Sequence, residues 1–149
     1  MSGGHLTFGL RPPIGGYILR ITREEWFHQV FELKKYYPGV RRTWTPGLMV
    51  ILAKKMEAGD SFVGYGTIGG FVELENLPEG ERKMCESMGW KGAIIFDSLF
   101  KFDPPLPIKE TVLHDSKAKG RYLHGFPLTN DQLDSILSKA EVLCNIYKV

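Results

Sequence analysis

The stretch from Ser61 to Glu73 constrains the fold more than any other part of the sequence. It is rich in β-branched and aromatic residues, holds four glycines, and carries no charge before its last position. It is well short of the roughly 20 apolar residues that span a bilayer, so we predict a strand and expect no membrane segment. The pair Gly69-Gly70 predicts a bulge or sharp bend, the feature by which a sheet curls toward a barrel.

Capping boxes, in which Ser or Thr is followed three residues later by Glu or Gln, mark the starts of two predicted helices. They occur at Thr22–Glu25 and at Thr129–Gln132, and apolar residues at helical spacing follow each one. The first of these helices is predicted to continue to Pro38-Gly39. A third, short helix is predicted from Pro78 to Met88, ended by Gly89.

Further strands are predicted at residues 17–21, 48–53, 93–96 and 122–126, with an extended, proline-containing sheet edge from 100 to 107. With 149 residues the chain has the length of one domain. We predict an N-terminal extension over residues 1–15 and a single α+β domain over 16–149. Its architecture should be a small curled mixed β-sheet with flanking helices.

The net charge of +2 conceals an uneven distribution along the chain. Residues 1–56 carry nine Lys and Arg against three acidic residues, whereas residues 57–110 carry five against ten. A basic island in the first block can attract phosphate backbones. The alternative is a solvated helix end and a strand edge kept soluble by lysines. The island consists of Lys34, Lys35, Arg41, Arg42, Lys54 and Lys55.

Several kinds of chemistry find no support in the residue pattern. Cys85 and Cys144 are too few for a disulfide framework and lack metal-ligand spacing. The four histidines are scattered without an i, i+4 pair, and the glycine run 64–70 matches neither a P-loop nor a dinucleotide fingerprint. We therefore predict no metal and no cofactor. The first fifteen residues lack a signal-peptide core, and we expect a cytoplasmic protein.

Trp44 and His124 each have two interpretations. Trp44 lies in a polar loop beside arginines, where an indole can stack on a base, worth about 1–3 kcal/mol. It can equally plug one end of a curled sheet. His124 follows Arg121 and Tyr122 near the end of a predicted strand. It can contact phosphate or act as a general base, or it can be a partly exposed strand histidine satisfied by solvent.

Five fragments follow one another in a recognisable order. They are the strand-then-helix opening 17–26, the basic loop with Trp44, the turn 56–60, the strand 90–96 leading into the proline segment 102–107, and residues 120–129 before the terminal helix. Together they resemble the PUA-like superfamily and, within it, most closely the EVE domain, a relative of the YTH readers of methylated RNA. The resemblance covers roughly residues 16–140.

This resemblance implies a pseudo-barrel with a pocket between the first helix and the sheet, where relatives hold nucleic acid or a flipped, modified base. Trp44 and Tyr65 are then the expected walls of the pocket, and Thr43 and His124 the expected polar contacts. The cationic side chains expected on the nucleic-acid backbone are Arg41, Arg42, Arg121, Lys54 and Lys55.

We therefore predict a non-catalytic domain that binds RNA, or a modified nucleobase within nucleic acid. The alternative is a nuclease or small-molecule hydrolase on the scaffold of the related ASCH domains, some of which cut RNA. In that case His124 with Asp97 or Asp60 would supply the base. A third interpretation is an interaction domain without a ligand, whose pocket is plugged by Phe62 and Trp44.

Overall fold

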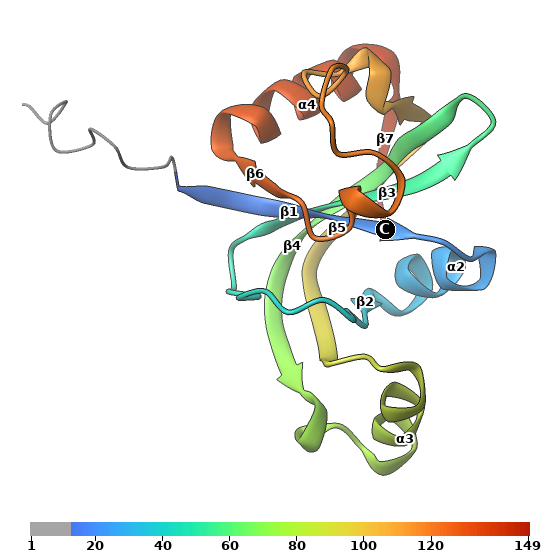
Figure 1. Cartoon of the computed structure of the whole chain (residues 1–149), viewed down its shortest axis with the longest axis vertical. Helices are drawn as coiled ribbons and strands as arrows, with labels where there is room; N and C mark the ends of the chain where they lie inside the picture. The colour runs from blue at the N-terminus through green and yellow to red at the C-terminus, as the bar shows by residue number, and fades with distance from the viewer. Residues whose placement is uncertain (1–12) are drawn as a thin grey trace, which may run out of the picture.

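The computed structural model describes residues 13–149 as one curled, open sheet with helices around it (Figure 1). Seven strands form the sheet, in the order β2-β5-β4-β3-β1-β6, with β7 also paired to β5. The strands are β1 (Ile14–Ile21), β2 (Lys35–Tyr36), β3 (Met49–Met56), β4 (Gly59–Glu73), β5 (Gly92–Pro107), β6 (Pro127–Thr129) and β7 (Asn145–Lys148). The helices are α2 (Glu24–Leu33), α3 (Glu79–Met88) and α4 (Asn130–Leu143), with 3-10 turns η1 (Leu74–Asn76), η2 (Ile108–Glu110) and η3 (Gly120–Leu123).

The sheet is covered on both faces, which explains why its central strands are apolar without interruption. In Figure 1, α4 lies on one side of the sheet and α2 on the other, while α3 sits at the far end of the β4–β5 hairpin. Side chains of β1 alternate accordingly. Tyr17, Leu19 and Ile21 pack on the α2 side, and Ile18 packs on the α4 side with Ile136.

Three hydrophobic clusters therefore make up the core. The α2-side cluster includes Val30, Phe31, Trp44, Val50 and Leu52. The α4-side cluster includes Ile51, Phe62, Phe102, Leu123 and Leu133. A small α3 cluster holds Tyr37, Leu77, Cys85 and Ala93, with Trp90 packed against it.

β1 and β3 form a parallel pair that brings two backbones close together. Gly16 lies opposite Met49 in this pair. A Cβ atom at Gly16 would overlap the backbone carbonyl oxygen of Met49, so a residue without a side chain is required there.

The bend predicted at Gly69-Gly70 is confirmed. The pairing of β4 with β5 shifts register between Ile68 and Gly70, and also between Phe62 and Gly64 and between Thr67 and Ile68. Such bulges increase local twist and bend the strand. The long hairpin consequently bends away from the main sheet toward α3, as Figure 1 shows.

The predicted beginning and end of the first helix are wrong. α2 begins at Glu24 with Arg23 as its N-cap, and no side chain caps it. The helix ends at Leu33 because Lys34 takes a left-handed conformation (φ 56°). The chain after it is extended, since Lys35 and Tyr36 pair with Ile95 and Ile94 of β5. Sheet pairing thus overrides the helical periodicity that continues toward Pro38.

Other predictions fare unevenly. The capping box at Thr129 and the end of α3 at Gly89 are confirmed. The strand predicted at 122–126 is wrong, because this segment is the turn η3 followed by Gly125 in a left-handed conformation (φ 79°). Residues 92–107 form one strand rather than two. Within the predicted edge from 100 to 107, Phe100–Asp103 pair with β7, so the outer side lacks a strand partner only after Asp103.

The predicted α+β class with a curled mixed sheet is confirmed by this architecture. The predicted extension over residues 1–15 falls largely outside the described residues, and β1 already begins at Ile14. No helix within residues 13–149 has both the length and the apolar character needed to cross a membrane.

Candidate nucleic-acid pocket

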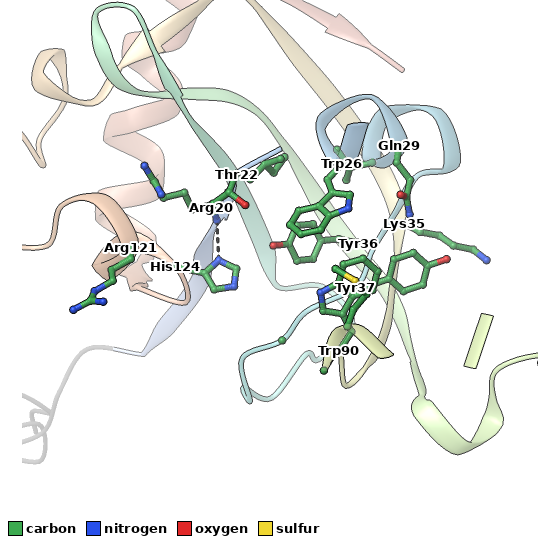
Figure 2. A pocket seen from close by; sticks show the side chains of 15 residues that line it. Arg20, Thr22, Trp26, Gln29, Lys35, Tyr36, Tyr37, Trp90, Arg121 and His124 are labelled. Carbon is green, nitrogen blue, oxygen red and sulfur yellow. Dashed lines mark hydrogen bonds between the residues drawn. The ribbon is translucent and has the colours of Figure 1, made fainter. Parts of the chain in front are cut away.

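A pocket of about 460 Å³ opens between α2 and the sheet. Its lining comes from four parts of the chain: the end of β1, helix α2 with the β2 segment after it, the turn that ends α3, and the η3 segment (Figure 2). The lining residues are Arg20, Ile21, Thr22, Trp26, Gln29, Val30, Lys35, Tyr36, Tyr37, Gly39, Met88, Gly89, Trp90, Arg121 and His124.

Aromatic rings form the wall of this pocket on the α2 and α3 sides. Trp26 and Trp90 meet edge to face, with centroids 5.4 Å apart and planes at 74°. Trp90 in turn stacks on Tyr37, with centroids 5.4 Å apart and planes at 6°. Because each ring is braced by another, the wall is preorganised to receive a flat, apolar group.

The hydroxyl of Tyr37 fixes the α3 side of this wall to β2. It donates a 2.7 Å hydrogen bond to Glu81 Oε2, and the same oxygen accepts from Lys35 Nζ at 3.3 Å. Burial, with Glu81 as a second cause, raises the pKa of Tyr37. Burial alone raises the pKa of Tyr36, so both phenols stay protonated at neutral pH.

His124 faces the aromatic wall from the η3 segment. Its Nδ1 accepts a 3.0 Å hydrogen bond from the backbone N–H of Arg20, drawn as a dashed line in Figure 2. This bond leaves the ring proton on Nε2, which can donate to a ligand. Burial lowers the pKa of His124, and the nearby charges of Arg42 and Arg20 lower it further, so the ring is neutral at neutral pH.

The segment that carries His124 is tied to β1 by backbone hydrogen bonds. Gly125 N donates to Ile18 O at 2.7 Å, and Ile18 N donates to Phe126 O at 2.9 Å. Arg42 Nε donates to Gly125 O at 3.1 Å, while its guanidinium lies 5.9 Å from the centre of the Tyr17 ring. Arg42 thus holds the His124 side of the pocket in place instead of reaching into it.

The charges at the pocket are cationic. No aspartate or glutamate is among the lining residues in the described part of the chain. Arg20 is paired with Asp60 (3.1 Å), and Lys35 with Glu81 (3.3 Å). Arg121 is exposed and lies over the ring of Tyr122, with no carboxylate within salt-bridge distance among residues 13–149. Its charge is therefore available to an anion at the mouth.

Trp44 and Tyr65, the two walls expected from the sequence, do not line this pocket. Trp44 is only 6% exposed and packs edge to face on Tyr17, with ring centroids 5.3 Å apart. Tyr65 belongs to the α4-side cluster, where it stacks on Phe100 at 4.9 Å. The structure therefore places the two rings in different clusters and does not bring them together.

The remaining expected residues are divided between several places. Arg121 and His124 line the pocket. A second, wider hollow of about 1010 Å³ lies between the 40–46 loop and the region of α3, and its lining includes Arg41, Arg42, Thr43 and Trp44. On β3, Lys54 pairs with Glu24 at 3.0 Å and Lys55 is exposed, and neither lines either hollow.

The sequence interpretation missed the residues that form the aromatic wall, which are Trp26, Tyr37 and Trp90. The helical spacing places Trp26 on the apolar face of a helix, which is correct, but that face ends at the pocket. The sequence feature that could have indicated this wall is the position of the aromatic residues relative to the helix ends. Aromatic residues stand shortly after both helix ends, at Tyr36-Tyr37 and at Trp90.

The arrangement around His124 lacks the partner that a general base needs. Both oxygens of Asp60 are engaged, by Arg20 Nε at 3.1 Å and by Gly120 N at 3.2 Å. Asp97 is an exposed residue of β5 that does not line the pocket. Phe62, the expected plug, is fully buried on the α4 side and does not fill the pocket either.

The described residues offer no evident place for a metal. Residues 13–149 contain no group of three or more His, Cys, Asp and Glu side chains arranged to hold an ion. Both cysteines are thiols without a disulfide partner, and Cys85 is fully buried. Burial raises the pKa of each thiol, which disfavours the reactive thiolate.

Comparison with known proteins bears on the fold. No protein-family model matches the chain, and no curated protein sequence matches it. The structure is similar to that of the ASCH domain from Zymomonas mobilis, with a TM-score of 0.61 and 10% identity over 88% of this chain and 96% of that one. The predicted PUA-like fold is thereby confirmed in its ASCH-like form. The closer resemblance to EVE domains stays a prediction.

Proposed function

We propose that this chain binds single-stranded RNA by accepting one unpaired base into the pocket between α2 and the sheet. The observation that carries the proposal is the combination of a braced aromatic wall, an available cation at Arg121, and a lining without carboxylates in the described chain. A nucleotide has the matching properties: a flat ring to stack and a phosphate that acidic residues would repel.

Each part of the pocket has a role in this proposal. The base lies against Trp26 and Trp90, and stacking of this kind is worth about 1–3 kcal/mol per base. His124 donates from Nε2 to an acceptor on the base edge, and the amide of Gln29 supplies a donor and an acceptor. Arg121 pairs with the neighbouring phosphate. Extruding a base from a duplex costs a few kcal/mol, so single strands are preferred.

A modified base is the finer form of the same proposal. Pockets for small molecules typically measure about 300–1,000 Å³, and a volume of about 460 Å³ leaves room for a base that carries an added group. The ASCH-like fold supports the proposal, because the PUA-like domains that this chain resembles include readers of nucleic acid.

Binding of fluorescent single-stranded RNA pools, measured by anisotropy at low and moderate salt, tests the proposal. Trp26→Ala should weaken binding about five- to 150-fold, as expected from the loss of about 1–3 kcal/mol of stacking. Tyr147→Ala is the matched control, because Tyr147 is 52% exposed on β7 and does not line the pocket. Equal binding by Trp26→Ala and wild type, or no RNA binding at low salt, would refute the proposal.

Two further probes separate the possible ligands. Single-stranded DNA of the same sequence should bind less tightly if a ribose 2′-hydroxyl is recognised. Competition by modified and unmodified nucleosides shows whether the pocket selects an added group. Equal competition by all nucleosides would contradict the modified-base form of the proposal while leaving RNA binding itself standing.

A further inference from the structure

The two sides of the pocket differ strongly in charge. Residues 116–124, which we call the basic segment, contain Lys117, Lys119 and Arg121 and no acidic residue. These three side chains are exposed. Residues 73–88, which we call the acidic arm, contain five glutamates against two basic residues and include η1 and α3. The basic segment lines the pocket through Arg121 and His124, and the acidic arm reaches it through Met88.

A second part of the basic segment borders a smaller hollow, separate from the pocket. It measures about 200 Å³ and lies between the β3–β4 turn and the connection from η2 to η3. Lys109, His114 and Lys119 are among its lining residues. Its carboxylate, Asp60, already accepts hydrogen bonds from Arg20 Nε and Gly120 N, so its charge is compensated.

Only a short stretch of chain separates the smaller hollow from the pocket. Lys119 lines the smaller hollow and Arg121 lines the pocket, two residues further along the chain. Their Cα atoms are therefore at most about 7 Å apart. Asp60 accepts hydrogen bonds from Gly120 N at 3.2 Å and from Arg20 Nε at 3.1 Å, so the backbone between the two cations is held in place.

The wide hollow between the 40–46 loop and the region of α3 is a poor path for a phosphate backbone. Arg41 and Arg42 line one of its walls, but Glu73, Glu75 and Glu86 line the other. Arg42 is also engaged with Gly125 O. Phosphates entering this hollow would meet like charges within the range of electrostatic repulsion.

We propose that the backbone of a bound strand crosses the basic segment, from Arg121 over Lys119 into the hollow lined by Lys109, and runs away from the acidic arm. This inference rests on the proposed function and adds to it the direction in which the strand leaves the pocket. The partner is a single strand of nucleic acid several nucleotides long, and the cations that recognise its phosphates are Arg121, Lys119 and Lys109.

The test compares lysines on the two sides with an eight-nucleotide RNA. Lys119→Ala and Lys109→Ala should each weaken binding about two- to fivefold at low salt. Each should also reduce the slope of log K against log salt by about 0.7, the value for one lost contact to a single strand. Lys83→Ala on α3 is the matched control and should change neither quantity, because Lys83 is an exposed lysine paired with Glu79.

Removing charge from the acidic arm tests the other half of the inference. Glu75→Gln and Glu86→Gln should leave the affinity for the eight-nucleotide RNA unchanged or raise it. Weaker binding by these variants, or a reduced salt slope in Lys83→Ala, would place the strand on the acidic arm and overturn the inference. Wild-type affinity and slope in both Lys119→Ala and Lys109→Ala would overturn it as well.

A mononucleotide separates failure of this inference from failure of the proposed function. Its binding should depend on Trp26 but not on Lys109 or Lys119, since it occupies the pocket alone. If the RNA binds in a Trp26-dependent way while the lysine variants behave as wild type, the function holds and the strand path is wrong. If no probe depends on Trp26, the proposed function itself fails.

Discussion

Replacing Trp44 by alanine distinguishes the two roles considered for this residue, packing in the core and stacking on a ligand. The side chain is 94% buried, from its exposed fraction of 6%. A large aromatic residue buries about 150–250 Å², which at about 25 cal/mol per Å² is worth about 4–6 kcal/mol. Losses for Trp→Ala in protein cores are about 3–5 kcal/mol, and in this variant the loss includes the edge-to-face contact with Tyr17. We expect a loss of about 4 kcal/mol in the free energy of unfolding.

Urea unfolding followed by far-UV circular dichroism measures this loss without relying on the tryptophan that is removed. In a chain of this length 1 kcal/mol corresponds to about 2–4 °C in Tm, so Tm should fall by about 8–16 °C. Trp26→Ala is the matched comparison. Trp26 is only partly buried and lines the pocket, so this variant should lose about half as much stability but most of its RNA binding.

RNA binding by Trp44→Ala, measured where the variant is still folded, should stay within about twofold of wild type. The reasoning is refuted if Trp44→Ala loses less than about 1 kcal/mol of stability and also loses RNA binding. That result would mean that the base stacks on Trp44 and that the pocket between α2 and the sheet does not bind the RNA.

Three further predictions concern stability. In the folded state the pKa of His124 is lowered below its ordinary value of 6.5, so the unfolded chain takes up a proton at higher pH than the folded chain. The free energy of unfolding should therefore fall as the pH drops from about 7 to 5. Urea titrations should show a smaller fall for His124→Gln, and an equal fall would contradict this. Gly16→Ala should prevent folding or cost several kcal/mol, whereas Gly70→Ala, with nothing within 4 Å of its Cβ position, should cost less than about 1 kcal/mol in the same assay. Thr129→Ala should lose about 1 kcal/mol with the capping box of α4, while the exposed Thr45→Ala serves as control, and equal stability of the two variants would count against a role for the cap.

The parts of the fold that sequence predicts well are those set by local chemistry. The capping box at Thr129, the helix end at Gly89 and the bend at Gly69-Gly70 each depend on one or two residues and their neighbours. The α+β class followed from the same local signals together with the apolar runs of the central strands.

The errors arise where contacts distant in sequence decide the structure. Lys35 and Tyr36 leave helical geometry because β5 offers them pairing partners about sixty residues away. Trp44 was placed in a polar loop, correctly, but its burial depends on Tyr17 and the α2-side cluster. No local pattern reports such a contact.

The candidate site was predicted only in part, because most of it also depends on contacts between residues distant in the sequence. Arg121 and His124 were selected from one short motif, and both line the pocket. Its aromatic wall combines Trp26, Tyr37 and Trp90 from three separate segments, so no single stretch of the sequence contains it. The segments are far apart in the chain and meet where the turn after α3 packs against α2, with the rings of Trp26 and Trp90 5.4 Å apart.

The three hydrophobic clusters of the core meet at the pocket. Trp26 packs against the α2-side cluster, Trp90 against the α3 cluster, and His124 follows Leu123 of the α4-side cluster. The pocket is thus bordered by residues that belong to or adjoin all three clusters. A base bound there contacts residues next to all three clusters, so we expect amide hydrogen exchange to slow in both α3 and η3 when the ligand binds.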